Sequence, residues 1–424
     1  MNYKECVEYI TNIPRNGGKN DLAYVRYLLD KVYVDGSARI IHVAGTNGKG
    51  SVCAFIDSIL RNAGFRTGLF TSPHLVSINE RIRICGVEIS DEDFLSCFND
   101  IMTIVNEEGM EHHPSFFEFI FLIAMRYFSL KKVDIIVLET GLGGRLDMTN
   151  SVGTKDVTVI TKIGYDHMEY LGDTLESIAS EKAGILKSGV PLVYWDNEDT
   201  ASEVIRNSAE NKNITRYPIN NQMLRLNAVS KEGIDFSFVN EYYRFDNLEL
   251  GLVGKYQMQN AALAIEAVKS LKDDRINDLV IRRGLEGAKW AGRMQELEPS
   301  VYVDGAHNID GIEAFLEAVK ALSCEGARKL LFSVVADKQY MDMAAAIMNS
   351  HVFTEIYICP IDSKRALDKE HLVKAFDDWT DGDVHFYVSL SDAYRAAKDS
   401  LGVNDVLYVA GSLYLIGQLM ADIS

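Results

Sequence analysis

The sequence predicts an α/β protein of two domains, each built on a mostly parallel sheet with helices on its faces. Short apolar runs rich in β-branched residues, such as residues 133–138 and 157–160, are typical of buried parallel strands. These runs alternate with longer stretches whose apolar residues recur at helical spacing. The alternation stops near residue 200 and starts again at residue 301. A chain of 424 residues is also longer than a single hydrophobic core normally accommodates, so two domains are expected.

The N-terminal domain is expected to be a doubly wound sheet that contains a phosphate loop. A turn at residues 14–18 separates two helices, Gly64 ends a third, and Ser72-Pro73 breaks a strand. The expected helices are residues 3–10, 21–34, 51–63, 91–108 and 115–130, and the expected strands are 39–44, 67–71, 133–138 and 157–160.

The segment of residues 200–250 is more polar, and period-2 stretches such as 234–238 predict a small antiparallel appendage. A helix is expected at 256–271, followed by a basic and glycine-rich segment. A second strand–helix series starts at 301, with strands at 329–335, 353–358, 384–388 and 406–410, and predicts a Rossmann-like C-terminal domain. We therefore expect domains at residues 1–295 and 296–424.

Composition narrows the class of protein. The 47% hydrophobic and 25% charged content is typical of globular proteins, and no apolar run approaches the ~20 residues that span a bilayer. The N-terminus lacks a secretory signal pattern, so a cytoplasmic protein is expected. A formal charge of −18 argues against nucleic acid as the main partner. The six cysteines are scattered without a Cys-x-x-Cys pair, which predicts buried thiols without a disulfide framework or a zinc site.

The stretch Gly45-Thr46-Asn47-Gly48-Lys49-Gly50-Ser51 lies between an expected strand and an expected helix. Glycines allow a tight turn of backbone N–H groups, the helix N-terminus attracts anions, and Lys49 adds a full charge. The match to the usual phosphate loop is imperfect, because Gly50 stands at the hydroxyl position and the hydroxyl falls at Ser51. A polyphosphate site is favoured, and a glycine-rich turn that binds nothing is the alternative.

Three further positions are candidates for chemistry in the N-terminal domain. Glu139 ends a buried strand, where a carboxylate is costly unless it meets a cation such as Mg²⁺, although a capping glutamate is an equal alternative. His167 follows another strand end, but imidazole is an unusual partner for Mg²⁺. Lys182 lies late in a helix, where a solvated charge is the ordinary interpretation.

The second domain repeats this pattern at Asp304-Gly305-Ala306-His307-Asn308. An apolar strand ends in Asp304, whose carboxylate is suited to a ribose hydroxyl. A cluster of helix N-caps is the alternative, because Asp and Asn are favoured at that position.

Taken in order, these motifs resemble those of the folylpolyglutamate synthase and bifunctional dihydrofolate synthase–folylpolyglutamate synthase family, in the Mur-ligase superfamily of ATP-dependent amide ligases. The resemblance covers nearly the whole chain. Besides the stretches quoted above, it rests on Thr71-Ser72-Pro73-His74-Leu75, Asn79-Glu80-Arg81-Ile82-Arg83, residues 139–150, residues 181–185, Asn260-Ala261-Ala262, Gly292-Arg293 and Gly411-Ser412-Leu413-Tyr414.

The resemblance implies roles that the residues alone leave open. Lys182 matches a lysine that is carbamylated in the family and supports a second magnesium ion, and Ser72 replaces Ser51 as the metal hydroxyl. The implied metal ligands are Ser72, Glu139 and His167. The implied ATP contacts are Thr46, Asn47, Gly48, Lys49, Gly50, Ser51, Asn260, Arg293, Asp304 and His307. The implied pteroate-side contacts are Arg81, Arg145, Leu146 and Asp147.

The resemblance also implies the reaction. A folate or dihydropteroate carboxylate attacks MgATP to give an acyl phosphate, which L-glutamate converts to an amide. Two Mg²⁺ ions are implied, a monovalent cation such as K⁺ is a further candidate, and a monomer is expected. Met148 stands where Ala or Ser is common, which leaves the preference between substrates open. The competing hypotheses are a peptidoglycan-precursor ligase of the same superfamily and an ATP-binding switch without ligase activity.

Overall fold

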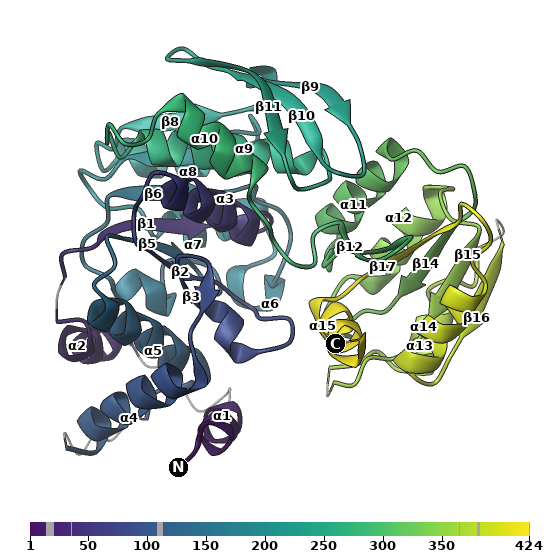
Figure 1. Cartoon of the computed structure of the whole chain (residues 1–424), viewed down its shortest axis with the longest axis horizontal. Helices are drawn as coiled ribbons and strands as arrows, with labels where there is room; N and C mark the ends of the chain where they lie inside the picture. The colour runs from purple at the N-terminus through teal and green to yellow at the C-terminus, as the bar shows by residue number, and fades with distance from the viewer. Residues whose placement is uncertain (14–20, 35, 108–112, 364, 380–381, 424) are drawn as a thin grey trace. The chain divides into compact units, whose positions relative to one another are not determined.

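The computed structural model describes residues 1–13, 21–34, 36–107, 113–363, 365–379 and 382–423, which include neither the turn expected at 14–18 nor Glu108. The chain forms two compact units (Figure 1). Unit 1 comprises Met1–Asn221 and Gln259–Gly287, and unit 2 comprises Gln222–Met258 and Ala288–Ser424. Each unit has its own sheet flanked by helices, which confirms the predicted two-domain α/β class.

The sheet of unit 1 has the strand order β4-β3-β2-β5-β1-β6-β7-β8. Strands β2, β5, β1, β6, β7 and β8 pair in parallel, and β3 and β4 extend the sheet in antiparallel pairing. The strands are β1 Arg39–Ala44, β2 Thr67–Phe70, β3 Ile82–Ile84, β4 Val87–Glu88, β5 Ile135–Glu139, β6 Val157–Ile160, β7 Leu192–Trp195 and β8 Arg216–Ile219. Because β1 lies between β5 and β6, the ends of these three strands meet at one edge of the sheet.

Helices cover both faces of this sheet (Figure 1). The α-helices of unit 1 are α1 Tyr3–Thr11, α2 Leu22–Val32, α3 Lys49–Asn62, α4 Asp91–Glu107, α5 Phe116–Lys131, α6 Met168–Leu171, α7 Leu175–Ala183, α8 Thr200–Glu210, α9 Tyr256–Lys269, whose first turn belongs to unit 2, and α10 Asp278–Glu286. Short 3₁₀ turns occupy η1 Ile78–Arg81, η2 Met148–Ser151 and η3 Asn221–Met223.

The core of unit 1 forms where α5 packs against the sheet. Residues Phe119 to Met125 of α5 are each fully buried, so this helix is covered on all sides. Its side chains share one apolar cluster with Ile136 and Leu138 of β5 and with Phe94 and Phe98 of α4. Burying each such side chain contributes roughly 1.5–3 kcal/mol. This packing fixes β5 and the position of Glu139 at its end.

The prediction for residues 200–250 is only partly correct. Helix α8 and strand β8 occupy its first part, and β8 pairs in parallel with β7 as the edge of the main sheet. The antiparallel sheet is limited to β9 Leu224–Val229, β10 Ile234–Val239 and β11 Arg244–Leu250. Strand β8 is short and contains Pro218, which is tolerated because the strand lies at the edge. Because β8 is short and contains a proline, its sequence does not show the alternation of apolar and polar residues that would predict a strand.

The main sheet of unit 2 has the order β12-β13-β17-β14-β15-β16. Strand β12 Gln295–Glu298 is antiparallel, and the other pairings are parallel, as predicted for a Rossmann-like domain. The remaining strands are β13 Val301–Val303, β14 Arg328–Phe332, β15 Glu355–Ile358, β16 Asp383–Phe386 and β17 Val406–Ala410. The helices are α11 Ile309–Ala321, α12 Tyr340–Asn349, α13 Lys369–Lys374, α14 Leu390–Asp399 and α15 Leu413–Ile423.

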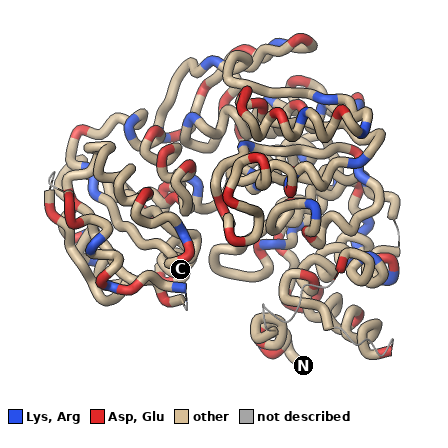
Figure 2. The backbone as a smooth tube through the Cα atoms, turned by 180° about the vertical axis from the view of Figure 1, so that it is seen from behind, with Lys and Arg blue, Asp and Glu red and all other residues tan. Residues whose placement is uncertain are grey.

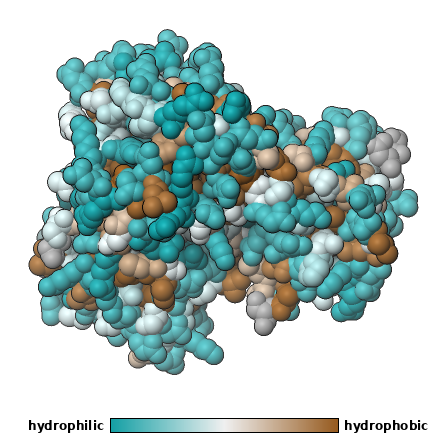
Figure 3. Space-filling view, turned by 45° about the horizontal axis from the view of Figure 1, so that its top comes forward, coloured by the Kyte–Doolittle hydropathy of each residue, from teal (hydrophilic) through white to brown (hydrophobic). Residues whose placement is uncertain are grey.

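The chain carries a formal charge of −18, and acidic and basic residues are interspersed along the backbone of each unit (Figure 2). The face in Figure 3 is mainly hydrophilic, with separate apolar patches. None of the helices that the structure describes combines the length and apolar content needed to cross a membrane. The six cysteines are free thiols, and four of them are buried as predicted, whereas Cys85 is exposed and Cys324 is half-buried.

Candidate functional site

The phosphate loop connects β1 to α3, as predicted, and two of its glycines are sterically required. A Cβ on Gly45, which has φ +150°, would lie 1.8 Å from Thr161 Oγ1. A Cβ on Gly48, which has φ +90°, would lie 2.2 Å from Asn260 Oδ1. Asn260 therefore packs directly on the loop, next to the residue that precedes α3. Helix α3 begins at Lys49. The first N–H groups of this helix have no partner within the helix and are therefore available to an anion bound at the N-terminus.

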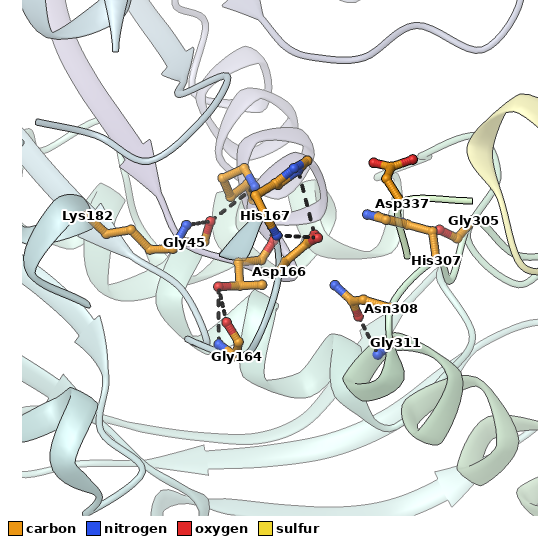
Figure 4. Close-up of polar contacts among 12 residues, drawn as sticks. Gly45, Gly164, Asp166, His167, Lys182, Gly305, His307, Asn308, Gly311 and Asp337 are labelled. Atoms are coloured by element: carbon orange, nitrogen blue, oxygen red, sulfur yellow. Dashed lines mark hydrogen bonds and ion pairs between the residues drawn. The ribbon is translucent and has the colours of Figure 1, made fainter. Parts of the chain in front are cut away.

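Two lysines converge on one carbonyl of this loop. Lys49 Nζ donates to Gly45 O and to Thr46 O, both at 3.1 Å. Lys182 Nζ, from the last turn of α7, donates to Gly45 O at 2.8 Å (Figure 4). The arrangement places two basic side chains beside the backbone of the glycine loop.

The pKa of Lys182 is strongly shifted by its surroundings. Its side chain is 4% exposed, so the interpretation as a solvated charge is wrong. Burial, reinforced by the charge of Lys49, lowers the pKa of Lys182 to about 7. At neutral pH a large fraction of this amine is therefore unprotonated and nucleophilic.

The segment after β6 supports the loop and was not singled out in the sequence. Lys162 O accepts hydrogen bonds from Thr46 N at 3.0 Å and from Asn47 N at 3.3 Å. Thr161 Oγ1 donates to Asn47 O at 2.7 Å, and Thr46 Oγ1 donates to Gly164 O at 3.1 Å. The sequence did contain one indication of this role, because residues 161–164 follow a strand predicted to end at the same edge of the sheet as the loop.

Three side chains of unit 1 are candidates for holding a divalent cation. Glu139 is 3% exposed at the end of β5, and its Oε2 accepts a hydrogen bond from Ser72 N at 2.9 Å. Two of the predicted ligands, Ser72 and Glu139, are thus adjacent. His167, at the start of α6, adopts a left-handed backbone conformation with φ +51°. Its Nε2 lies 3.8 Å from Asp166 Oδ2, and Asp166 Oδ1 accepts from His167 N (Figure 4).

The buried Glu139 carboxylate, with a serine beside it, is chemically suited to a hard divalent ion. Within the described part of the chain, no three His, Cys, Asp or Glu side chains are grouped in a way that could hold a metal.

The glycine-rich loop after β5 is organised around Asp147, which is 3% exposed. Its Oδ2 accepts from Gly141 N at 3.0 Å and Leu142 N at 2.9 Å, while Oδ1 accepts from the backbone and hydroxyl of Thr149. Because Thr149 gives its hydroxyl proton to Asp147, the 2.8 Å contact between His42 Nε2 and Thr149 Oγ1 requires a proton on Nε2. Asp147 therefore shapes the loop from inside.

The other predicted substrate contacts differ in exposure. Leu146 is 48% exposed. The Arg145 guanidinium is well exposed and donates twice to Glu181 Oε1, at 2.8 and 3.0 Å. Arg81 is 7% exposed, and its Nε donates to His74 Nδ1 at 2.8 Å. Burial and the Arg81 charge lower the pKa of His74 to about 4, which keeps the imidazole neutral.

In unit 2, Asp304 stands at the end of β13 and is 4% exposed. Its Oδ2 accepts from Tyr256 Oη at 3.0 Å and from Met294 N at 2.9 Å, and Oδ1 accepts from Ala306 N at 2.9 Å. Burial raises the pKa of Asp304 despite the nearby charge of Arg293. This carboxylate ties the β13 end to the 292–294 segment.

The remaining residues of this motif surround the same strand end. His307 Nδ1 donates to Gly305 O at 2.8 Å, so its Nε2 is the acceptor in the neutral ring. Asn308 caps α11 by accepting from Gly311 N at 2.8 Å (Figure 4). A Cβ on Gly305 would lie 2.3 Å from Arg293 Nη1, so Arg293 packs on this glycine. The N-cap hypothesis is therefore correct for Asn308.

The sequence and the fold of this chain are both similar to those of known ligases. The model of the Mur ligase middle domain matches residues 43–268, and that of the Mur ligase glutamate ligase domain matches residues 292–413. The Bacillus subtilis dihydrofolate synthase/folylpolyglutamate synthase is 35% identical over 98% of each chain. Escherichia coli FolC in complex with DHPP and ADP superimposes with a TM-score of 0.87 at 29% identity, covering 100% of this chain and 98% of that one. A bifunctional folylpolyglutamate synthase/dihydrofolate synthase with Mn, AMPPNP and L-glutamate bound gives the same TM-score at 27% identity, with coverage of 100% and 98%.

The phosphate loop, the glutamate at the end of β5 and the two matched domain models define a Mur-type, ATP-dependent ligase. Within that class, the chain belongs to the folylpolyglutamate synthase and dihydrofolate synthase family.

Proposed function

We propose that the protein joins L-glutamate to the carboxylate of a reduced folate, and also of dihydropteroate, with ATP as the driving substrate. The observation that carries the proposal is the convergence of Lys49 and Lys182 on the Gly45 carbonyl at the N-terminus of α3. Relatives that bind ADP, AMPPNP, DHPP and L-glutamate support it. They also favour this reaction over that of a peptidoglycan-precursor ligase.

The reaction proceeds in two steps. The substrate carboxylate attacks the γ-phosphorus of ATP, which gives an acyl phosphate and ADP. The amine of L-glutamate then attacks the acyl carbon, the amide forms, and phosphate leaves. Because an amide does not form spontaneously from a carboxylate in water, ATP cleavage supplies the driving force.

The chain stabilises the charge that moves in the first step. Lys49 and the N–H groups at the start of α3 hold the phosphates and offset the negative charge of the transferring phosphoryl group. Thr46, Asn47, Gly48, Gly50 and Ser51 complete the loop. Asn260 packs on Gly48 and supports the shape of the loop.

Ser72, Glu139 and His167 would hold Mg²⁺. When bound, a magnesium ion neutralises phosphate charge and orients the γ-phosphate for in-line attack. The carboxylate of Glu139 is kept at the strand end by Ser72 N, so these two donors are ordered together.

Lys182 is proposed to react with CO₂ to form a carbamate, which would support a second magnesium ion. The lowered pKa of its buried amine supports this, because only the unprotonated amine attacks CO₂. K⁺ is a further candidate ion beside the phosphates.

The other substrate contacts follow the family assignment. Arg293, Asp304 and His307 are proposed to contact the nucleotide. Arg81, Arg145 and Leu146 are proposed to line the pterin-side pocket, and Asp147 contributes by holding the loop at Gly141 and Leu142. We further propose a cytoplasmic monomer with functional domains at residues 1–295 and 296–424.

Phosphate release tests the proposal. Purified protein with MgATP and L-glutamate is expected to release phosphate when either tetrahydrofolate or dihydropteroate is added, and not without a pterin substrate. Release with one substrate alone would define a monofunctional enzyme. Release with neither, or release that does not require glutamate, would reject the ligase assignment.

A further inference from the structure

Asn150 joins two segments of the proposed active site. Its Nδ2 donates to Arg145 O at 3.1 Å and to Gly184 O at 3.2 Å. Arg145 belongs to the proposed pterin-side loop, and Gly184 ends α7 just after Lys182. The Asn150 amide therefore bridges the proposed substrate loop and the end of the helix that carries the reactive lysine, beside the bond from Arg145 N to Glu181 O at 2.7 Å.

Lys155 holds this amide in place. Its side chain is 7% exposed, and Nζ donates to Asn150 Oδ1 at 2.8 Å and to Ile185 O at 3.2 Å. The Lys155 amine donates to Oδ1 while two backbone carbonyls accept from Nδ2, so the three contacts together define the orientation of the Asn150 amide. With Oδ1 held by Lys155, Nδ2 must face the two backbone carbonyls. Rotating the amide by 180° would oppose its oxygen to both of them.

The electrostatic surroundings do not explain why a lysine occupies this position. Among the described residues Lys155 makes no ion pair, and Asp147, the carboxylate that acts on it, is bonded to its own loop. Burial and the positive charges of Lys187, Lys212 and Arg26 lower the pKa of Lys155 to about 6. A neutral amine has two N–H donors, and the structure offers Lys155 two acceptors.

We propose that Lys155 is a positioning residue that, through Asn150, fixes the Arg145 loop against the end of α7 and thereby sets the affinity for the pterin substrate. The inference rests on the proposed assignment of residues 145–147 to the pterin side. It concerns geometry alone, because Lys155 is bonded to Asn150 and to a backbone carbonyl, and neither is assigned to catalysis.

Lys155→Met tests the proposal, because methionine fills the same volume without a donor. Lys212→Met is the matched control: Lys212 Nζ donates to Leu186 O at 2.9 Å, on the same segment, but has no bond to Asn150. We expect Lys155→Met to raise the KM for tetrahydrofolate at least about fivefold, with the KM for ATP changed by less than about twofold. Lys212→Met should leave both values within about twofold of the wild type.

A second variant reaches the same bonds from the other side. Asn150→Ala should raise the KM for tetrahydrofolate by a similar factor, and the double variant with Lys155→Met should be no worse than the more severe single variant. Additive effects would overturn the proposal, as would equal rises in the KM values for ATP and tetrahydrofolate. If Lys155→Met lowers the yield of folded protein, Asn150→Ala alone still tests the proposal, because it too should raise the KM for tetrahydrofolate without raising the KM for ATP.

Arg145→Met separates this inference from the function on which it rests. A raised KM for tetrahydrofolate in Arg145→Met but not in Lys155→Met would retain the pterin-side assignment and overturn the role of Lys155. The reverse result would retain the role of Lys155 in positioning the loop and remove the Arg145 side chain from the contacts.

Discussion

The low pKa of Lys182 leads to a quantitative prediction about its reaction with CO₂. Its pKa falls from 10.5 to about 7 because the amine is buried and lies near Lys49. At pH 7.5 roughly three quarters of such an amine is unprotonated, against about one in a thousand for an ordinary lysine. The fold therefore raises the concentration of the nucleophilic form several-hundred-fold.

The sign of the pH dependence follows directly. Lowering the pH from 8 to 6 reduces the unprotonated fraction of Lys182 about tenfold, so carbamate formation should fall in the same range. We expect enzyme depleted of CO₂ at pH 6 to lose most of its activity and to recover it when bicarbonate is added at pH 8.

The assay is ¹³C NMR of the protein in ¹³C-bicarbonate, combined with phosphate release in matched samples. The wild type should show a carbamate resonance that grows with an apparent pKa near 7, and Lys182→Met should lack it. Lys162→Met is the control, because the loop contacts of Lys162 are made by its backbone carbonyl. A resonance unchanged in Lys182→Met, or activity independent of CO₂ in the wild type, would refute the reasoning.

Three further predictions address the loop and the metal. Lys49→Met should abolish glutamate-dependent ADP release while circular dichroism shows an intact fold, and normal turnover would remove Lys49 from the phosphate site. Glu139→Ala should raise the magnesium concentration required for half-maximal activity at least about tenfold, and an unchanged requirement would exclude Glu139 as a ligand. Gly45→Ala should destabilise the protein by about 2–5 kcal/mol in urea unfolding, because its Cβ would overlap Thr161 and its φ is positive. Gly153→Ala, where a Cβ meets nothing within 4 Å, should stay within about 0.5 kcal/mol of the wild type, and equal losses would contradict the steric argument.

The features that sequence reasoning identified correctly are local ones. The strand, glycine turn and helix around Gly45–Lys49 are encoded within a short stretch, and the structure reproduces them as β1, the loop and α3. The strand ends at Glu139 and Asp304 were equally readable, because each follows a continuous apolar run. Parallel pairing then brings Glu139 beside the end of β1, where its backbone is in register with Val43.

The features that were missed depend on contacts distant in sequence. The burial of Lys182 arises because α7 packs against the loop, and the bond from Lys182 to Gly45 joins residues 137 positions apart. Strand β3 has three residues and is defined by pairing with β2, so no periodicity revealed it. The role of Asp147 within its own loop, and the support from Thr161, likewise depend on hydrogen bonds that no spacing encodes.

Transfer of oxygen from the substrate carboxylate to phosphate tests the central claim most directly. Tetrahydrofolate labelled with ¹⁸O in the reacting carboxylate should be converted with MgATP and L-glutamate, and the released phosphate analysed by mass spectrometry. An acyl phosphate places one carboxylate oxygen on phosphorus, so each phosphate should carry one ¹⁸O atom from a fully labelled substrate. Phosphate without label, with the second carboxylate ¹⁸O released into water instead, would contradict the proposed reaction.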